Sequence, residues 1–165
     1  MFVMTNQAYV GQPLLRSEDD RLLRGGGTFT ADIALPKMLH IAFVRSPHAH
    51  ARINGIDAEQ AIKMPGCVGI ITADDLVDVG RLDSVGRPGM TVTPGGAHPI
   101  LAGERALYAG QPVAAIVANS AGQAADAAAC ISIEYEPLPA IKDLESAASD
   151  TVPLLHESMG SNVGA

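Results

Sequence analysis

The stretch PVAAIVANSAGQAADAAACISIEYEPL, residues 112–138, carries the clearest structural signal in the sequence. It opens with a continuous apolar run of the kind found in strands that are buried on both faces. Ser120, with Gln123 three residues later, forms a capping-box pattern before an alanine-rich segment that strongly favours a helix. Apolar and polar residues then alternate over 131–136, which indicates a half-buried strand. The stretch therefore predicts a strand–helix–strand unit whose small-faced helix packs closely on a sheet.

A second unit of this kind is predicted upstream. Apolar and other residues alternate in MLHIAFVRS (38–46), and extended character resumes after Pro47 in AHARINGID (49–57). Asp57 has the features of a helix N-cap, with Gln60 at the capping-box position. A Glu59–Lys63 pair at i,i+4 spacing supports the helix, Pro65-Gly66 ends it, and CVGIIT (67–72) forms the next short strand.

The remaining segments are less regular. Ser17 stands before acidic residues and a short helical turn through Leu22 and Leu23, which the glycines at 25–27 end as a C-cap and turn. These glycines follow a helix instead of opening one, so a phosphate cradle is disfavoured. Glycines and prolines recur from Ala73 to about Pro99 and predict a long irregular loop of a kind that is usually functional or ordered by a partner.

These patterns predict a mixed α/β fold with a mixed sheet, two principal helices and one long Gly/Pro loop. We expect an N-terminal lead-in over 1–12, one domain over 13–145, and a small polar tail over 146–165 with no closing element. A chain of 165 residues can bury a core without disulfides or a structural metal.

Composition excludes several functional classes. The net charge of −7, with scattered basic residues, disfavours general nucleic-acid binding. The sequence contains neither a membrane-spanning apolar run nor a secretion signal, so we expect a cytoplasmic protein. Cys67 and Cys130 lie far apart without metal-ligand spacing and are expected to be small buried side chains.

The most polar motif is VRSPHAHARI, residues 44–53, in which Arg45 and Arg52 flank His48 and His50. Two histidines two residues apart could share one face of a strand, but a zinc site needs further ligands, and the arginines would repel a cation. Anion binding by the arginines is a second interpretation. The third, which we favour, is a scaffold hydrogen-bonded at a strand break set by Pro47, with these four residues at an interface with a partner domain. Substitution of either histidine by alanine should then weaken assembly or stability.

Several segments together resemble one protein family. Four of them are similar to segments of the α/β hammerhead domain of one type of subunit: RSPHAHARI (45–53), PGCVGIITADD (65–75), YAGQPVA (108–114) and YEPLPA (135–140). It is the molybdenum-binding large subunit of the xanthine dehydrogenase/aldehyde oxidase/aerobic carbon monoxide dehydrogenase family, and the resemblance spans roughly residues 11–157. It implies an enzyme that hydroxylates aldehydes, carbon monoxide, purines or other N-heterocycles with water-derived oxygen at a molybdenum–pterin (molybdopterin) centre, and passes electrons through [2Fe–2S] clusters to FAD.

The same resemblance implies that this chain is not catalytic by itself. In the family, the pterin-binding loops and the catalytic glutamate lie downstream of the hammerhead, so no catalytic, cofactor-binding or metal-binding residue is assigned here. The expected partners are the rest of the large subunit, an iron–sulfur subunit and an FAD subunit, as for a truncated or split large subunit. An independent module that binds a small ligand or a protein is the alternative, and a stand-alone enzyme is disfavoured because no nucleophile or acid–base set is visible.

Overall fold

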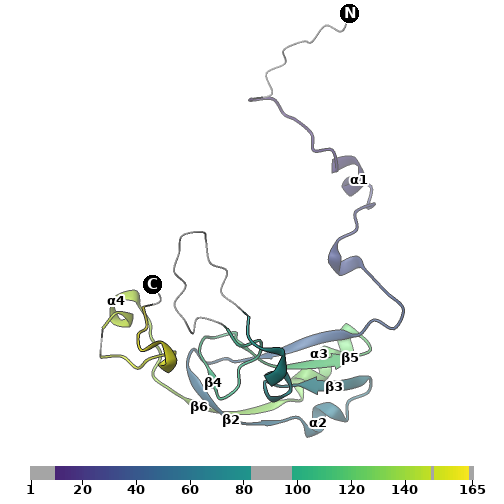
Figure 1. Ribbon diagram of the computed structural model, residues 1–165. Coiled ribbons are helices and arrows are strands. Elements are labelled where there is room, and N and C mark those ends of the chain that lie inside the picture. Colours follow the sequence, from purple (N-terminus) through teal and green to yellow (C-terminus); the bar gives the residue numbers. More distant parts are fainter. Residues whose placement is uncertain (1–9, 83–97, 150, 164–165) are drawn as a thin grey trace, which may run out of the picture. The chain divides into compact units, whose positions relative to one another are not determined.

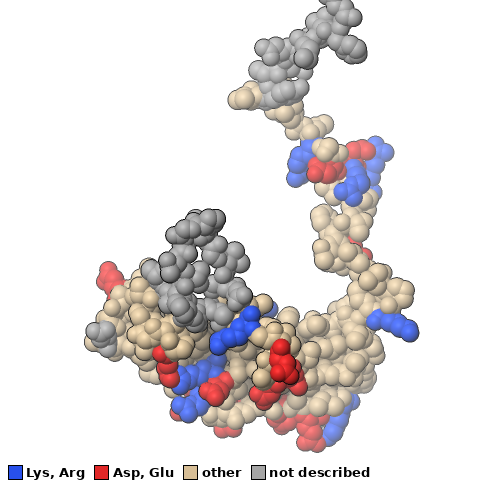
Figure 2. Space-filling view, in the orientation of Figure 1, with Lys and Arg blue, Asp and Glu red and all other residues tan. Residues whose placement is uncertain are grey.

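A computed structural model describes residues 10–82, 98–149 and 151–163 of the chain. It divides into two units, Met1–Pro36 and Lys37–Ala165 (Figure 1). In the first unit, the described residues form a short helix, α1 (Asp19–Leu23), and a 3₁₀ turn, η1 (Thr30–Asp32). Figure 2 shows basic and acidic side chains intermingled around α1.

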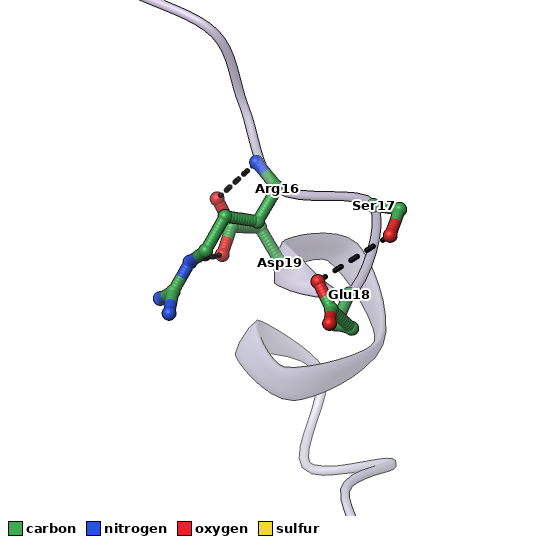
Figure 3. A network of polar contacts seen from close by, with 4 residues as sticks. All are labelled: Arg16, Ser17, Glu18 and Asp19. Atoms are coloured by element: carbon green, nitrogen blue, oxygen red, sulfur yellow. Dashed lines mark hydrogen bonds and ion pairs between the residues drawn. The ribbon is translucent and has the colours of Figure 1, made fainter.

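The expected Ser17 cap on α1 is wrong. The N-cap position is Glu18, without a side-chain cap, and the Ser17 hydroxyl donates instead to the Glu18 carboxylate at 3.4 Å (Figure 3). The backbone N–H of Asp19 already donates to the Arg16 carbonyl, and the Asp19 carboxylate accepts the backbone N–H of Arg16 at 3.2 Å. The glycine stop is confirmed, because the N–H of Gly25, at φ 72°, bonds back to the last turn of α1.

The second unit contains two antiparallel three-stranded sheets. In the first, β5 (Pro112–Ala118) lies between β1 (His40–Arg45) and β3 (Cys67–Ile71). In the second, β2 (Ala51–Asp57) lies between β4 (Arg105–Ala106) and β6 (Ser132–Pro137). The mixed α/β class is confirmed, but the named strands form two antiparallel sheets where one mixed sheet was expected.

Both predicted strand–helix–strand units are present, but the two strands of each unit belong to different sheets. The helix α2 (Glu59–Ile62) leads from β2 to β3, and α3 (Ala121–Ala129) leads from β5 to β6. The chain thus passes between the sheets through each helix, and the strands that flank a helix are not neighbours. The local patterns predicted strands and helices correctly but could not show which strands pair.

The two predicted helix caps have different outcomes. The Ser120 cap is confirmed, since its hydroxyl oxygen accepts the backbone N–H of Gln123. The Asp57 cap is wrong, because Asp57 remains in β2, paired with Ser132, and the N-cap of α2 is Ala58. The Asp57 carboxylate still accepts the N–H of Glu59 at 3.0 Å, so it stabilises the turn that leads into the helix.

The core lies where α2 and α3 cover one side of the first sheet. Three residues are fully buried there: Ala61 of α2, Ile116 of β5 and Ala127 of α3. Alanine at these helix positions allows the close approach that the sequence predicted. Cys67 and Cys130 pack against this cluster as free thiols, although each is half-buried instead of fully buried.

Two segments expected to be irregular contain local structure. The predicted loop after residue 73 begins with a 3₁₀ helix, η2 (Asp74–Val79); residues 83–97 lie outside the described part, and Leu82 pairs with His98 across them. A short helix, α4 (Leu144–Ala147), capped by Asp143, crosses the expected boundary between the domain and the tail, and the tail contains η3 (Glu157–Met159). Glu157 forms an ion pair of 2.7 Å with Arg105 of β4, so the tail contacts the second sheet.

Candidate functional site

The motif at 44–53 forms one of the links between the two sheets, from β1 to β2. It contains the end of β1, the turn over 46–50 and the start of β2. Ser46 is buried, its N–H donates to the carbonyl of Gln111, and its carbonyl accepts the N–H of Gly110. Its hydroxyl donates to the carbonyl of His48 at 3.0 Å and accepts the N–H of His48 at 3.1 Å. Ser46 therefore fixes the turn that follows Pro47.

His50 is the most buried titratable residue of the motif, with 4% of its surface exposed. Its Nδ1 lies 2.8 Å from the carbonyl oxygen of Pro139, and because a carbonyl only accepts, Nδ1 carries the hydrogen. The backbone carbonyl of His50 accepts the N–H of Leu138. Nε2 is buried and has no hydrogen-bond partner among the described residues. The ring thus anchors the chain that leaves β6, and its second nitrogen is free to accept a hydrogen bond.

His48 points to a different neighbour. Its ring meets the ring of Tyr135 edge-on, with centroids 5.0 Å apart and planes at 62°. The Tyr135 hydroxyl is buried without a hydrogen-bond partner among the described residues. Burial raises the pKa of Tyr135, and the nearby Ser46 hydroxyl partly opposes this shift. His48 therefore packs against β6 from the side of the turn.

The two arginines have separate roles. Arg45 donates from Nη1 to the carbonyl of Gly110 at 2.9 Å, and its guanidinium lies 5.5 Å from the centroid of the Phe43 ring. Arg52 reaches across the sheet to Glu136 on β6, with 3.5 Å between Nε and Oε2. Each guanidinium thus has a different partner within the chain.

A cavity of about 370 Å³ lies beside His50. Its polar lining is His50, Arg52 and the Arg105–Glu157 ion pair, and its walls are otherwise apolar: Leu138, Pro139, Pro153 and Leu154. Within residues 10–82, 98–149 and 151–163, no three His, Cys, Asp or Glu side chains come together to hold a metal ion. The charged lining is two arginines and one glutamate, and the Arg105 and Glu157 side chains pair with each other, an arrangement that suits packing and assembly better than a reaction.

Sequence reasoning identified the motif but not its contacts. Tyr135, Pro139 and Glu136 belong to the segment 135–139, more than 80 positions downstream of the motif, and β2–β6 pairing brings them next to it. The alternation of β6 indicated which residues share a face, although nothing local indicated the register.

In the described part of the chain, no helix is long and apolar enough to cross a membrane.

Comparison with known proteins gives the family. Residues 24–139 match the model for the aldehyde oxidase and xanthine dehydrogenase a/b hammerhead domain. The chain is 44% identical over 151 residues to the 6-hydroxypseudooxynicotine dehydrogenase complex subunit gamma of Paenarthrobacter nicotinovorans, covering 90% of this chain and 19% of that protein. It is 39% identical to the carbon monoxide dehydrogenase large chain of Afipia carboxidovorans, covering 87% of this chain and 17% of that protein.

Solved structures agree with this assignment. Quinoline 2-oxidoreductase from Pseudomonas putida 86 superposes with a TM-score of 0.79 at 36% identity, covering 90% of this chain and 19% of that chain. A Cu,Mo-CO dehydrogenase gives a TM-score of 0.77 at 37% identity and covers 90% of this chain. The chain thus spans less than a fifth of the length of these relatives. It belongs to the aldehyde oxidase and xanthine dehydrogenase hammerhead family.

Proposed function

We propose that this chain is a scaffold part of the large subunit of a molybdenum hydroxylase, with residues 13–145 as its hammerhead domain, and that it is not catalytic by itself. The complete enzyme would hydroxylate an aldehyde, carbon monoxide, a purine or another N-heterocycle with water-derived oxygen. One observation carries the proposal: the match covers about 90% of this chain but only 17–19% of the large subunits it resembles.

The described residues do not supply the ligands of an iron–sulfur cluster. They include no group of three potential metal ligands, and the sequence has only two cysteines, fewer than the four ligands of a [2Fe–2S] cluster. By the resemblance to the family, molybdopterin and FAD would also be held outside this chain. Its partners would be the rest of the large subunit, an iron–sulfur subunit and an FAD subunit, in the cytoplasm.

The contacts of the 44–53 motif support a scaffold role. Arg45 and His50 donate to backbone carbonyls on segments that lead into β5 or follow β6. The Ser46 hydroxyl donates to the backbone carbonyl of His48 within the turn. A buried polar side chain bound to backbone fixes a connection in place, whereas a catalytic group must reach a substrate. The motif accordingly sets how the two sheets meet.

The test combines a transplant with an activity measurement. The chain replaces its matching segment in the gamma subunit of the P. nicotinovorans complex, which is expressed with its partner subunits, and the isolated chain is assayed in parallel with an aldehyde, carbon monoxide, a purine and quinoline plus a dye acceptor. We expect an assembled, active complex and no turnover by the isolated chain. Turnover by the isolated chain would refute the scaffold role. Failure of the transplant to assemble, together with tight binding of a ligand by the free chain, would favour an independent binding module.

A further inference from the structure

Among the described residues, helices cover the first sheet on one side only. α2 and α3 cover the side on which Val44, Ile70 and Ile116 point inward. On the other side, the register places Ile41 opposite Val117 and Phe43 opposite Ala115. Because side chains alternate along a strand, these residues point away from the helices. We define Ile41, Phe43 and Val117, with Leu39 just before β1, as the open face.

The open face exposes large apolar side chains that strands usually bury. Ile41 is 56% exposed and Phe43 is 47% exposed, while their smaller neighbour Ala42 is partly buried against the helix layer. In β5, Val113 and Ala115 on the same side are buried, whereas Val117 at the far end is half-buried. This side of the sheet is therefore buried near Val113 and becomes exposed toward the end where His40 pairs with Ala118.

The pattern of β5 indicates a second layer. Its continuous apolar run, PVAAIVA, is typical of a strand with packing on both sides, and a sheet with an apolar face is stable when another layer covers that face. The four residues of the open face carry no charge, and the nearby Arg45 has its guanidinium over the ring of Phe43. A contiguous apolar surface with one positive charge at its edge fits an apolar protein surface.

We propose that the open face packs against the part of the large subunit that lies outside this chain. This inference rests on the proposed function. The rest of the large subunit is the expected partner of the open face because this chain covers 17–19% of the length of these relatives. More than four fifths of a large subunit would then be available to cover the face. The face differs from the turn of the 44–53 motif, where the side chains of Ser46 and His50 hydrogen-bond to backbone within the chain, and Arg45 is the motif residue that borders it.

Thiol labelling tests the proposal. Ile41→Cys and Phe43→Cys are prepared in the free chain and in the transplanted gamma subunit, with Ile62→Cys as a matched control because Ile62 of α2 is 61% exposed. Maleimide modification is followed at each site by mass spectrometry, so that Cys67 and Cys130 serve as internal references. We expect labelling at positions 41 and 43 to slow by about tenfold or more in the transplanted subunit, with little change at position 62.

The outcomes separate this inference from the function on which it rests. An assembled complex in which position 43 reacts as fast as in the free chain would refute the inference and leave the proposed function standing. Equal protection at position 62 would also refute it, since cover would not be specific to this face. Slow labelling of the free chain that speeds up on dilution would identify a second copy as the occupant instead. As a second measurement, Phe43→Gln should lower the unfolding midpoint of the transplanted subunit by more than it lowers that of the free chain, where the ring is already 47% exposed.

Discussion

Replacing His50 tests whether the histidines of the 44–53 motif act as structural anchors. The side chain is 4% exposed, and its Nδ1–H donates to the Pro139 carbonyl at 2.8 Å. This bond joins the start of β2 to the chain that leaves β6, 89 positions away. His50→Ala removes the bond and leaves a hole at the wall of the adjoining cavity.

The expected loss follows from these two changes. The hydrogen bond contributes about 1 kcal/mol net. Loss of a buried ring adds about 1–2 kcal/mol, because the surrounding residues close the space only in part. We therefore expect His50→Ala to lower the free energy of unfolding by about 2–3 kcal/mol. In His50→Asn the amide nitrogen can take the place of Nδ1, so this variant should recover about 1 kcal/mol of that loss.

Urea unfolding followed by circular dichroism measures these differences; the chain has no tryptophan to serve as a fluorescent probe. Arg52→Ala is the matched control, because its ion pair with Glu136 joins two half-exposed side chains and should contribute less than about 1 kcal/mol. If His50→Ala and Arg52→Ala lower stability equally, the anchoring role is wrong. If His50→Asn is no better than alanine, the hydrogen bond to Pro139 contributes nothing.

Further substitutions test the local geometry. Gly66 has φ 81°, and an added Cβ would contact the Gln123 side chain, so Gly66→Ala should cost at least about 1–2 kcal/mol in urea unfolding. Gly122→Ala, in α3 with open space around its Cα, should instead stabilise by about 0.5–1 kcal/mol, and the reverse order would contradict the described backbone. Burial, then the nearby charge of His98, lowers the pKa of His156 below its usual 6.5. Since the folded chain resists protonation there, stability should fall as the pH drops below about 7, and His156→Gln should remove that part of the pH dependence in thermal melts; an unchanged profile would argue against it.

The elements of this fold were predictable where a pattern is local. The β5–α3–β6 stretch combines an apolar run, a serine cap, an alanine helix and an alternating strand, and each of these depends on residues within a few positions of one another. The division into two sheets was not predictable, since it depends on pairs such as Ala51 with Pro137, which no local pattern specifies. The Asp57 cap failed for the same reason, because pairing with Ser132 extends β2 by one residue into the expected helix start.

The candidate site shows a similar division between residue type and contact. Two histidines between two arginines have the composition of a metal, anion or acid–base site, but the fold gives each side chain a different neighbour: backbone for Arg45 and His50, an aromatic ring for His48, and a carboxylate for Arg52. Chemistry needs such groups to converge on one point, whereas here they diverge from a turn that joins two sheets. The apolar side chains of β1 are the opposite case, since the alternation over 38–46 predicted a strand but did not show that Ile41 and Phe43 are 56% and 47% exposed. The apolar open face therefore needs a covering layer, whereas the 44–53 motif already has a contact for each of its charged or aromatic side chains. An interface with a partner domain at Arg45, His48, His50 and Arg52 remains a prediction.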